Sequence, residues 1–400
     1  MRILFFSITV PFPATDGGRI RVLNLLEQLA RTEQITFLAL QTTPEDQSGI
    51  DYLTGLGIDC HLVERSPSLP SVTMDTVIRA ITKRQPVTVS RYYSSKLEKL
   101  FHQLLDQKKI DLIHYEMFHA AQYSLPTKIP TLLSTQNIDS YIWKRLAKET
   151  KNPVKKLIYW TQAKAFSRCE RESYGEFSAA TCVSANDQEL LNRACPQLPV
   201  HVIANGVDLD LYQVSEVIEE PETLIFTGSM DWYPNEDAVT FFLKSILPHV
   251  RQSYPNVRML VVGQHPTDKL RQMVELANTD SEVIITGRVD DVKPYINRAS
   301  VYVVPLRIGG GTRLKILEAL ALRKAVVSTT IGAEGLNLVD QQEIILADQP
   351  DQFARAVIEL LDDAQRRRSL GEKGRERVEK NYGWPAIVEN LRQVYHNLVN

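Results

Sequence analysis

The chain has 400 residues, of which 44% are hydrophobic and 24% charged, an ordinary balance for a globular protein and more chain than one typical domain holds. Lys and Arg total 46 against 48 Asp and Glu, so the net charge is -2 and no overall basic field points to nucleic acid as a partner. The four cysteines form no CxxC pair and no cluster with zinc spacing. This cysteine usage is typical of a cytoplasmic protein.

The N-terminus begins with an apolar stretch, MRILFFSITVPFP. This stretch covers only about eight residues, whereas a membrane-spanning helix needs about 20. It also lacks the small-residue cleavage site of a signal peptide. We therefore expect a buried first strand here.

Short apolar runs alternate with longer amphipathic stretches along the whole chain, and the runs are continuous rather than strictly alternating. Such runs are typical of strands that are covered on both faces. The expected strands are residues 3–8, 35–40, 111–116, 131–135, 179–184, 200–204, 223–227, 258–262, 283–286, 301–306, 325–329 and 343–346. Among the expected helices are residues 19–30, 237–250, 312–322 and 353–361. This alternation predicts an α/β fold with parallel sheets and right-handed crossovers.

The series of strands starts twice, once at Ile3 and again near Leu224. Between the two series, the segment that begins at Asn205 has turn residues and acids but no apolar periodicity, as expected of a linker. We therefore predict an N-terminal domain of residues 1–205 and a C-terminal domain of residues 206–380. An amphipathic helix in residues 381–400 either caps its own domain or crosses back to the first.

The strongest chemical signal is a glycine run between an expected strand and an expected helix. The run consists of Gly309, Gly310, Gly311 and Thr312. Free N–H groups at a helix start attract an anion, and glycines let the backbone approach a phosphate closely. Arg313 and Lys315 add cationic donors, and Glu318 could accept hydrogen bonds from a ribose. The alternative interpretation is a flexible loop with two solvated cations.

Two further glycine turns follow expected strands. Gly17 and Gly18 come after the first strand, with Asp16 as a candidate helix N-cap. Gly228 follows the first strand of the second series, where Asn235 or Asp237 is a candidate cap. Each turn alone is equally typical of ordinary capping. Together with the run at 309–312, the first turn suggests a phosphate held from both sides.

Polar residues also stand where two neighbouring strands of the first half end. His114, Glu116 and His119 follow or end the strand 111–116, and Gln136 and Asn137 follow the next strand. Because loops at the carboxyl ends of parallel strands form the ligand crevice, we expect these residues to meet an acceptor hydroxyl. The alternative is a structural histidine. No third ligand accompanies the His-x-Glu pair, so no metal is expected.

The segment 152–174 combines five cations with aliphatic and aromatic residues. The cations are Lys155, Lys156, Lys164, Arg168 and Arg171. A basic amphipathic helix with aromatics can lie on an anionic membrane surface. The alternative is a domain helix with one solvated face.

Taken together, these motifs resemble the GT-B glycosyltransferases, and in particular the family 4 retaining enzymes (group 1), in a branch with a GGGTRLK-type loop. Besides the glycine turns, the resemblance rests on ANGVD at 204–208, FTG at 226–228, VVG at 261–263, ITGRV at 285–289 and the run from 304 to 327. Ser184 before an acidic helix start adds to it. The resemblance covers nearly the whole chain.

The resemblance implies two Rossmann-like domains with parallel sheets facing across a cleft. It also implies a metal-independent, retaining transfer from a UDP-, GDP- or ADP-sugar to a glycan, lipid-linked or small-molecule hydroxyl. The donor's base would lie near Arg288 and Val289, its ribose at Glu318 and its phosphates or sugar at the glycine run. The acceptor would lie near His114, Glu116 and His119, and the last helix would return to the first domain.

Two departures from the family pattern stand out. The family commonly has a Glu-x7-Glu pair, whose second member matches Glu318 and whose first falls on Gly310. It also commonly places an Arg and a Lys after the strand that matches 224–227, where this chain has Asp231, Trp232 and Asn235. We expect Arg313 and Lys315 to replace those cations at the leaving phosphate, with His114 and His119 as further candidate catalytic residues.

Two other functions fit the same pattern. A GT-B nucleotide-sugar epimerase or hydrolase shares the fold but needs an acid/base set, and the sequence shows no clear one. A noncatalytic protein that binds nucleotide or glycan would fit the glycine at position 310.

Overall fold

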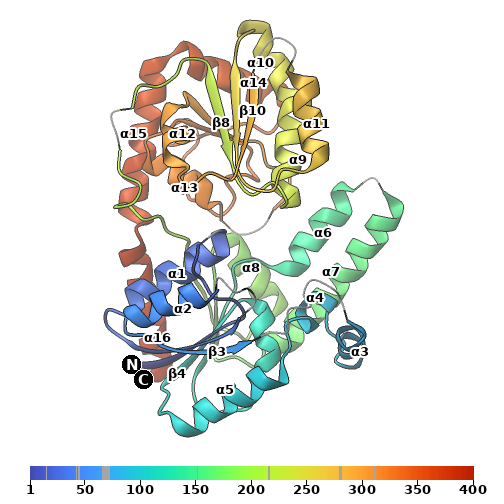
Figure 1. Ribbon diagram of the computed structural model, residues 1–400, viewed down its shortest axis with the longest axis vertical. Helices are drawn as coiled ribbons and strands as arrows, with labels where there is room; N and C mark the ends of the chain where they lie inside the picture. The colour runs from blue at the N-terminus through green and yellow to red at the C-terminus, as the bar shows by residue number, and fades with distance from the viewer. Residues whose placement is uncertain are drawn as a thin grey trace. The chain divides into compact units, whose positions relative to one another are not determined.

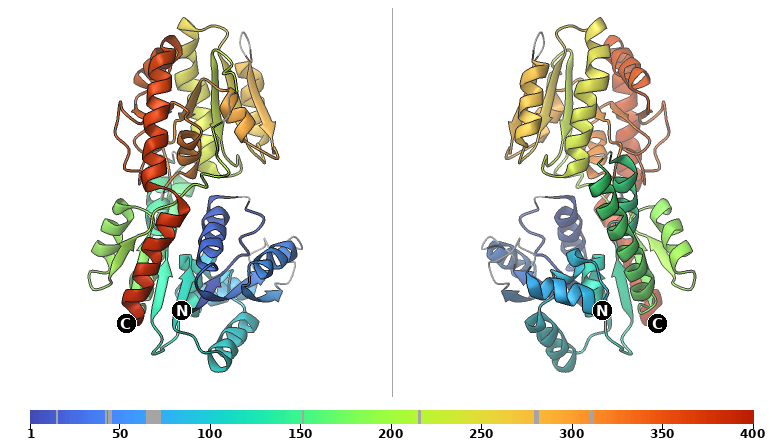
Figure 2. Two further views of the ribbon diagram at one scale, coloured as in Figure 1. Left: turned by 90° about the vertical axis from the view of Figure 1, so that its left-hand side faces the viewer. Right: turned by 90° about the vertical axis from the view of Figure 1, so that its right-hand side faces the viewer.

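The computed structural model describes residues 1–14, 16–41, 43, 46–64, 73–150, 152–214, 217–278, 282–309 and 312–400. The chain forms two compact units, one of Met1–Ala204 with Trp384–Asn400 and the other of Asn205–Gly383. Each unit is built on one parallel sheet with helices on both of its faces (Figures 1 and 2). The predicted α/β fold with two Rossmann-like parallel-sheet domains is confirmed.

The first unit has a seven-stranded parallel sheet in the order β3-β2-β1-β4-β5-β6-β7. Its strands are β1 (Arg2–Ser7), β2 (Gln34–Gln41), β3 (Asp59–Glu64), β4 (Leu112–Glu116), β5 (Thr131–Ser134), β6 (Ala179–Cys182) and β7 (Val200–Val202). Its helices are α1 (Gly17–Leu29), α2 (Asp46–Gly55), α3 (Met74–Thr82), α4 (Val87–Ser90), α5 (Ser95–Gln107), η1 (Phe118–Tyr123), α6 (Asp139–Glu149), α7 (Pro153–Tyr174), α8 (Ala185–Ala194) and α16 (Trp384–Val399).

The two faces of this sheet carry separate hydrophobic cores. Because successive strand side chains point to opposite faces, Ile3 and Phe5 join one core while Leu4 and Phe6 join the other. The core around Phe5 is completed by α1 and by α16, which arrives from the far end of the chain and buries Leu391 there. The first unit therefore depends on residues from both ends of the sequence.

The second unit has a six-stranded parallel sheet in the order β10-β9-β8-β11-β12-β13. Its strands are β8 (Thr223–Thr227), β9 (Arg258–Val262), β10 (Val283–Gly287), β11 (Val301–Val304), β12 (Val326–Ser328) and β13 (Ile345–Leu346). Its helices are α9 (Tyr233–Phe241), η2 (Phe242–Ile246), α10 (Leu247–Ser253), α11 (Asp268–Ala277), α12 (Lys293–Arg298), α13 (Leu314–Ala321), α14 (Pro350–Asp362) and α15 (Ala364–Asn381).

All the strands expected from continuous apolar runs are present, and three details differ. The strand β3 was not predicted, because as a half-exposed edge strand it has no continuous apolar run. The single helix expected at 237–250 is divided by a π-helical turn, η2, which comes just before Pro248. The helix expected from residue 312 begins at Leu314.

Replacing Leu391 by Ala should lower the free energy of unfolding of the first unit by about 2–5 kcal/mol, because it leaves a cavity in the core under α16. Urea denaturation followed by circular dichroism measures this change. Asn390→Ala, at the exposed neighbouring position, serves as the control and should cost much less. Equal losses in the two variants would show that α16 does not complete this core.

Candidate functional site

Four glycines stand at or just after the carboxyl ends of the strands of the second sheet. Gly228 and Gly263 directly follow β8 and β9, Gly287 ends β10, and Gly309 lies shortly after β11. Exposed Arg288 and half-buried Val289 follow the end of β10. In the sheet, β10 is three strands away from β11, after which Gly309 lies. In open α/β sheets this edge is where ligands bind.

Gly309 lies against the guanidinium of Arg313. Its φ is +155°, and a Cβ atom at this position would lie 2.0 Å from Nη2 of Arg313. Arg313 is the N-cap residue of α13 and its side chain forms no capping hydrogen bond, so the guanidinium turns back over the glycine. Gly310 and Gly311, which we expected to contact the donor phosphates, lie outside the described residues.

The ammonium of Lys315 lies beside the second glycine turn. Its Nζ donates a hydrogen bond to Oδ1 of Asn235 (2.9 Å) and lies 4.0 Å from the centroid of the Phe226 ring. A Cβ atom on Gly228 would be 2.7 Å from this Nζ, and one on Gly263 would be 1.8 Å from the carbonyl oxygen of Gly228. The φ of Gly228, +152°, is one that residues with a side chain rarely adopt, and the carbonyl oxygen of Gly228 leaves no space for a side chain at Gly263.

Asn235 holds Lys315 in place and is not a helix cap. Its Nδ2 donates to the carbonyl oxygen of Ser229 (2.8 Å), which leaves Oδ1 facing Lys315. The N-cap of α9 is Trp232, without a side-chain hydrogen bond, and Asp237 instead pairs with Arg307 at 2.6 Å. The expected capping role of Asn235 or Asp237 was therefore wrong, because both side chains have tertiary partners.

Burial changes the acidity of two groups on α13. Together with the charge of Arg313, and against the charge of Glu318, burial lowers the pKa of Lys315 to about 7. Burial likewise raises the pKa of Glu318, against a hydrogen bond from Tyr212 and the charge of Lys315. A bound anion would favour the charged form of Lys315, so this corner of the sheet suits a phosphate group.

Thr312, also expected at the donor, is buried against the segment that follows the first unit. Its Oγ1 accepts a hydrogen bond from Nδ2 of Asn205 at 2.6 Å. The hydroxyl can still donate one hydrogen bond of its own. Thr312 therefore ties the start of α13 to the ANGVD motif of the sequence.

His114, expected to meet an acceptor, is instead fully buried in the first unit. Its ring stacks on Phe5 with 4.2 Å between centroids, and both ring nitrogens are engaged, Nδ1 with the hydroxyl of Tyr395 (2.6 Å) and Nε2 with Glu116 (2.9 Å). The strand alternation turns His114 toward the core beneath α16. The prediction of direct acceptor contact is therefore wrong for His114, which is a structural histidine.

Glu116 is equally buried and belongs to the same polar network. Burial raises its pKa, but the hydrogen bond from His114 and the charge of Arg21 outweigh this, so the net pKa lies below the ordinary value. Gln136 donates to its other oxygen at 2.9 Å. Glu116 therefore sits under the sheet edge as a structural carboxylate, which contradicts the expected contact with an acceptor.

The network reaches the first glycine turn and the end of β7. A Cβ atom on Gly18 would lie 3.0 Å from Oε1 of Gln136. Arg21, on α1 and only 1% exposed, donates to the carbonyl oxygens of Ile203 (2.9 Å) and Ala204 (2.8 Å). These contacts fix the turn to the last residues of the first unit.

The other residues predicted in the first unit lie nearer the surface. Gly17 is exposed at the start of α1, and Asp16 caps this helix as expected by accepting from the N–H of Arg19 (3.0 Å). Asn137 is half-buried after β5. His119 is half-buried on η1, where burial lowers its pKa to about 4, so its ring is neutral at pH 7.

The sequence did not single out Phe226, Tyr212, Arg21 or Tyr395 as members of these sites, and it gave Asn235 a different role. Each of these five residues has its partner at least 70 residues away in the sequence. Nothing in the local pattern marks such pairs. The sequence did offer one indirect signal for Asn235. It follows the glycine turn at Gly228, and Lys315 had no assigned partner in the sequence.

Comparisons with known proteins cover both units. Residues 15–211 match the family described as Glycosyltransferase Family 4, and residues 221–363 match that described as Glycosyl transferases group 1. An uncharacterized 44.6 kDa protein in the cps region of Klebsiella pneumoniae is 21% identical over 399 residues, which cover 98% of each chain.

Two further proteins are similar in part or in fold. The phosphatidyl-myo-inositol mannosyltransferase of Mycolicibacterium smegmatis is 28% identical over 204 residues, or 49% of this chain and 51% of the relative. The crystal structure of Anabaena HepE in complex with UDP-glucose shares the fold with a TM-score of 0.68 at 13% identity, covering all of both chains.

Lys315→Met should stabilise the protein more at pH 6 than at pH 10. Between pH 7 and the ordinary value of 10.5 the folded protein releases the Lys315 proton while the unfolded chain keeps it. The unfolded chain then binds more protons, so this group's contribution to stability rises with pH through that window. The gain from removing the charge should therefore shrink by about 4 kcal/mol from pH 6 to pH 10.

Urea denaturation at both pH values measures the difference between variant and wild type. Lys380→Met, at an exposed position of α15, is the matched control and should show no such trend. A gain for Lys315→Met that does not change with pH would contradict the shifted pKa.

Proposed function

Because this chain belongs to the family 4 and group 1 glycosyltransferases, which have the GT-B fold, we propose that it moves a sugar from a nucleotide-sugar donor to a hydroxyl of a glycan or lipid-linked acceptor. The proposed transfer is metal-independent and retains the anomeric configuration. The observation that carries this proposal is the pair of cations, Arg313 and Lys315, packed against Gly309 and Gly228.

The donor diphosphate is proposed to lie at the start of α13. Glycines at 228 and 309 leave the backbone open to close approach, and Arg313 and Lys315 supply positive charge from one side. Asn235 and Phe226 fix the Lys315 ammonium before the substrate arrives. Charges that are already in position stabilise the negative charge that develops on the leaving phosphate, without reorganisation during the reaction.

In the proposed reaction the bond between the anomeric carbon and the β-phosphate oxygen breaks, and the acceptor oxygen attacks from the face that the phosphate leaves. The leaving phosphate oxygen takes the proton of the acceptor hydroxyl. This route needs no protein carboxylate as base, which agrees with glycine at position 310. The products are the glycosylated acceptor and a nucleoside diphosphate.

Glu318 is proposed to bind the ribose of the donor. Its carboxylate already accepts a hydrogen bond from Tyr212, which fixes one oxygen and leaves further lone pairs for a ribose hydroxyl. Arg288 and Val289 would contact the base at the end of β10. In the first unit, His119 and Asn137 remain the proposed acceptor contacts, while His114 and Glu116 support the turn at Gly18.

The acceptor class is proposed from the relatives. The mycobacterial protein is named as a phosphatidyl-myo-inositol mannosyltransferase, and phosphatidyl-myo-inositol is a lipid. In the part of the chain that the structure describes, no helix is both long and apolar enough to cross a membrane. We propose a cytoplasmic enzyme that meets its acceptor at the inner face of a membrane.

Arg313→Ala should lower kcat for sugar transfer by about 100- to 1000-fold, because it removes a charge that stabilises the leaving phosphate. Transfer of radiolabelled sugar to an acceptor extract under single-turnover conditions measures this loss. Arg368→Ala, an exposed arginine of the same unit, should transfer at the wild-type rate. If Arg313→Ala transferred sugar at the wild-type rate, the assignment of Arg313 to the leaving phosphate would be wrong.

A panel of UDP-, GDP- and ADP-sugars should identify the donor by thermal shift. A ligand at a hundred times its dissociation constant adds about 2.7 kcal/mol, which raises Tm by about 5–10 °C for a domain of this size. The same compound should shift Lys315→Met much less. If no nucleotide-sugar raised Tm, the donor proposal would fail. In a separate incubation of the donor without acceptor, net formation of an epimer would show that the protein is an epimerase instead.

A further inference from the structure

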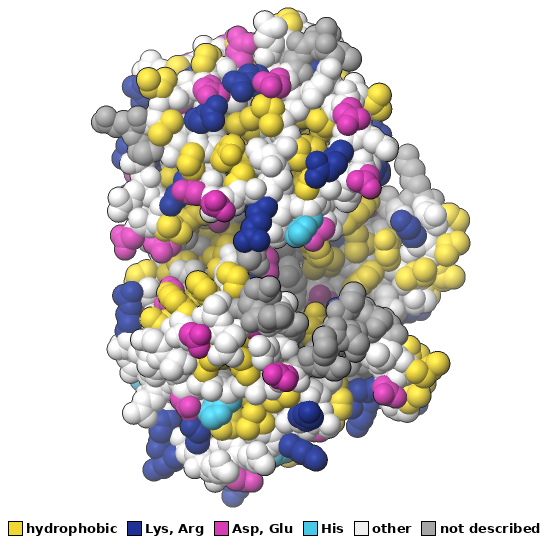
Figure 3. Space-filling view, in the orientation of Figure 1, with side chains coloured by type: hydrophobic (Ala, Val, Ile, Leu, Met, Phe, Trp, Pro, Cys, Tyr) yellow, Lys and Arg dark blue, Asp and Glu magenta, His cyan; other side chains and the backbone are white. Residues whose placement is uncertain are grey.

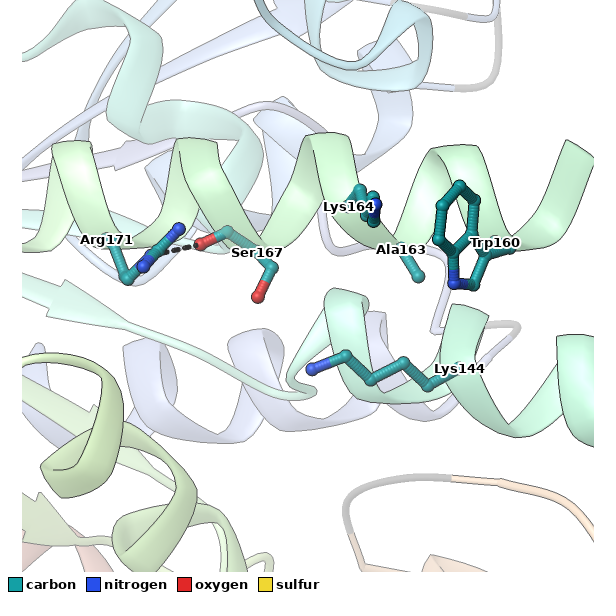
Figure 4. Close-up of a pocket in the computed structure, with 6 residues that line it drawn as sticks. All are labelled: Lys144, Trp160, Ala163, Lys164, Ser167 and Arg171. Carbon is teal, nitrogen blue, oxygen red and sulfur yellow. Dashed lines mark hydrogen bonds between the residues drawn. The ribbon is translucent and has the colours of Figure 1, made fainter.

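A groove runs between α6 and α7 of the first unit, away from the residues assigned to the donor and acceptor. It encloses about 450 Å³ and is lined by Lys144, Trp160, Ala163, Lys164, Ser167 and Arg171. Figure 4 shows Lys144 extended along the side of α6 that faces α7, and Ala163 and Ser167 pointing from α7 toward it. Packing of Trp143 against Tyr159 and Phe166 holds the two helices together.

The groove is lined by cations that have no ion-pair partner. None of Lys144, Lys164 and Arg171 forms an ion pair with any residue that the structure describes. Lys164 lies over the Trp160 ring at 3.6 Å and Arg171 donates to the carbonyl oxygen of Ser167, while buried Glu170 attracts Lys144 only at longer range. Three positive charges therefore meet around one hollow without a compensating acid at its surface.

The cationic face of α7 continues into an apolar one. The residues 157, 160, 164, 167 and 171 are spaced by three or four, so they share one side of the helix. Toward the N-terminus of α7 this side ends in Leu157 (61% exposed) and Trp160 (49%), flanked by Val154 (66%) and Ile158 (50%). Large apolar side chains that gather at one exposed helix end usually mark a contact surface.

A second apolar stripe lies on α3 of the same unit. Met74, Ile78 and Ile81 share one side of that helix and are 73%, 51% and 70% exposed. Just beyond α3, the carbonyl oxygen of Arg84 accepts a hydrogen bond from Arg168 of α7 at 2.6 Å, so the end of α3 is fixed to α7. Figure 3 shows hydrophobic side chains over the α6–α7 hairpin and over α3 on one face of the unit.

We propose that the α6–α7 groove binds the anionic headgroups of membrane phospholipids, with the apolar end of α7 inserted at the lipid interface. A phosphate would bind among Lys144, Lys164 and Arg171, and Leu157 and Trp160 would enter the acyl boundary, as amphipathic surface helices do. A free acidic polysaccharide would use the cations but would leave the exposed aliphatic residues without a partner. The inference rests on the proposed location at a membrane, to which it adds the binding site and the class of lipid, and it does not depend on the donor.

Co-sedimentation with phosphatidylcholine vesicles, with and without phosphatidylglycerol, tests this site. Wild-type protein should bind only the vesicles with phosphatidylglycerol, and less as salt is added. Each cation near the surface contributes about fivefold to binding, so Lys164→Gln/Arg171→Gln should bind about 25-fold more weakly. Lys96→Gln/Lys99→Gln, which removes the same charge from exposed positions of α5, should bind like wild type.

The apolar end is tested by Leu157→Ser/Trp160→Ser, which should weaken vesicle binding while leaving its salt dependence in place. Unchanged melting curves and an unchanged thermal shift with the donor would show that the variants fold and that the donor site is intact, whatever the vesicles show.

Three results would overturn the inference. The first is binding to vesicles that contain no anionic lipid. The second is an equal loss of vesicle binding in the α5 variant and in the groove variant. The third is that wild-type protein binds a heparin column but no vesicles, and that the groove variant no longer binds the column. The last result would make the groove a site for acidic glycans.

Discussion

The approach of the Lys315 ammonium to the backbone at Gly228 is the constraint on which the second unit's site depends. Gly228 has a φ of +152°, which residues with a side chain rarely adopt, and the carbonyl of Gly228 in turn excludes a side chain at Gly263. Asn235 and Phe226 complete the surroundings of the charge. Glycines at the carboxyl edge of this sheet therefore leave the backbone open beside Lys315 and Arg313, a geometry that leaves room for a ligand with negative charge.

The first unit buries charged and polar groups in the core of its parallel α/β fold. His114 and Glu116 lie fully inside and satisfy each other, with Tyr395 and Gln136 as outer partners. Arg21 is the matching cation and uses backbone carbonyls as acceptors. A buried polar group that loses its hydrogen-bond partner costs about 1–3 kcal/mol of folding stability. Removing one member of the network therefore also destabilises the partners that it leaves unpaired.

The sequence was sufficient for the fold because continuous apolar runs such as that of β1 follow from burial on both sheet faces, a local property. The half-exposed edge strand β3 lacked that property and was missed. At the site, the glycines and the cations at 313 and 315 stood together in the sequence. The partner of Lys315, by contrast, comes from α9, and no local rule connects them. The error at His114 has the same origin, since which face of a strand meets α16 is decided by tertiary packing.

The position of Tyr395 near the end of the chain has a consequence for synthesis. The helix that carries it, α16, supplies Trp384 and Leu391 to the core of the first unit. The residues of that core outside α16 are made much earlier, because they lie within residues 1–204. During translation the first unit thus emerges with part of one sheet face uncovered and His114 without its hydroxyl partner, while the second unit can fold as soon as residue 383 is available. The unit made first is therefore completed last, and until α16 has been made it exposes an apolar surface of the kind that chaperones bind.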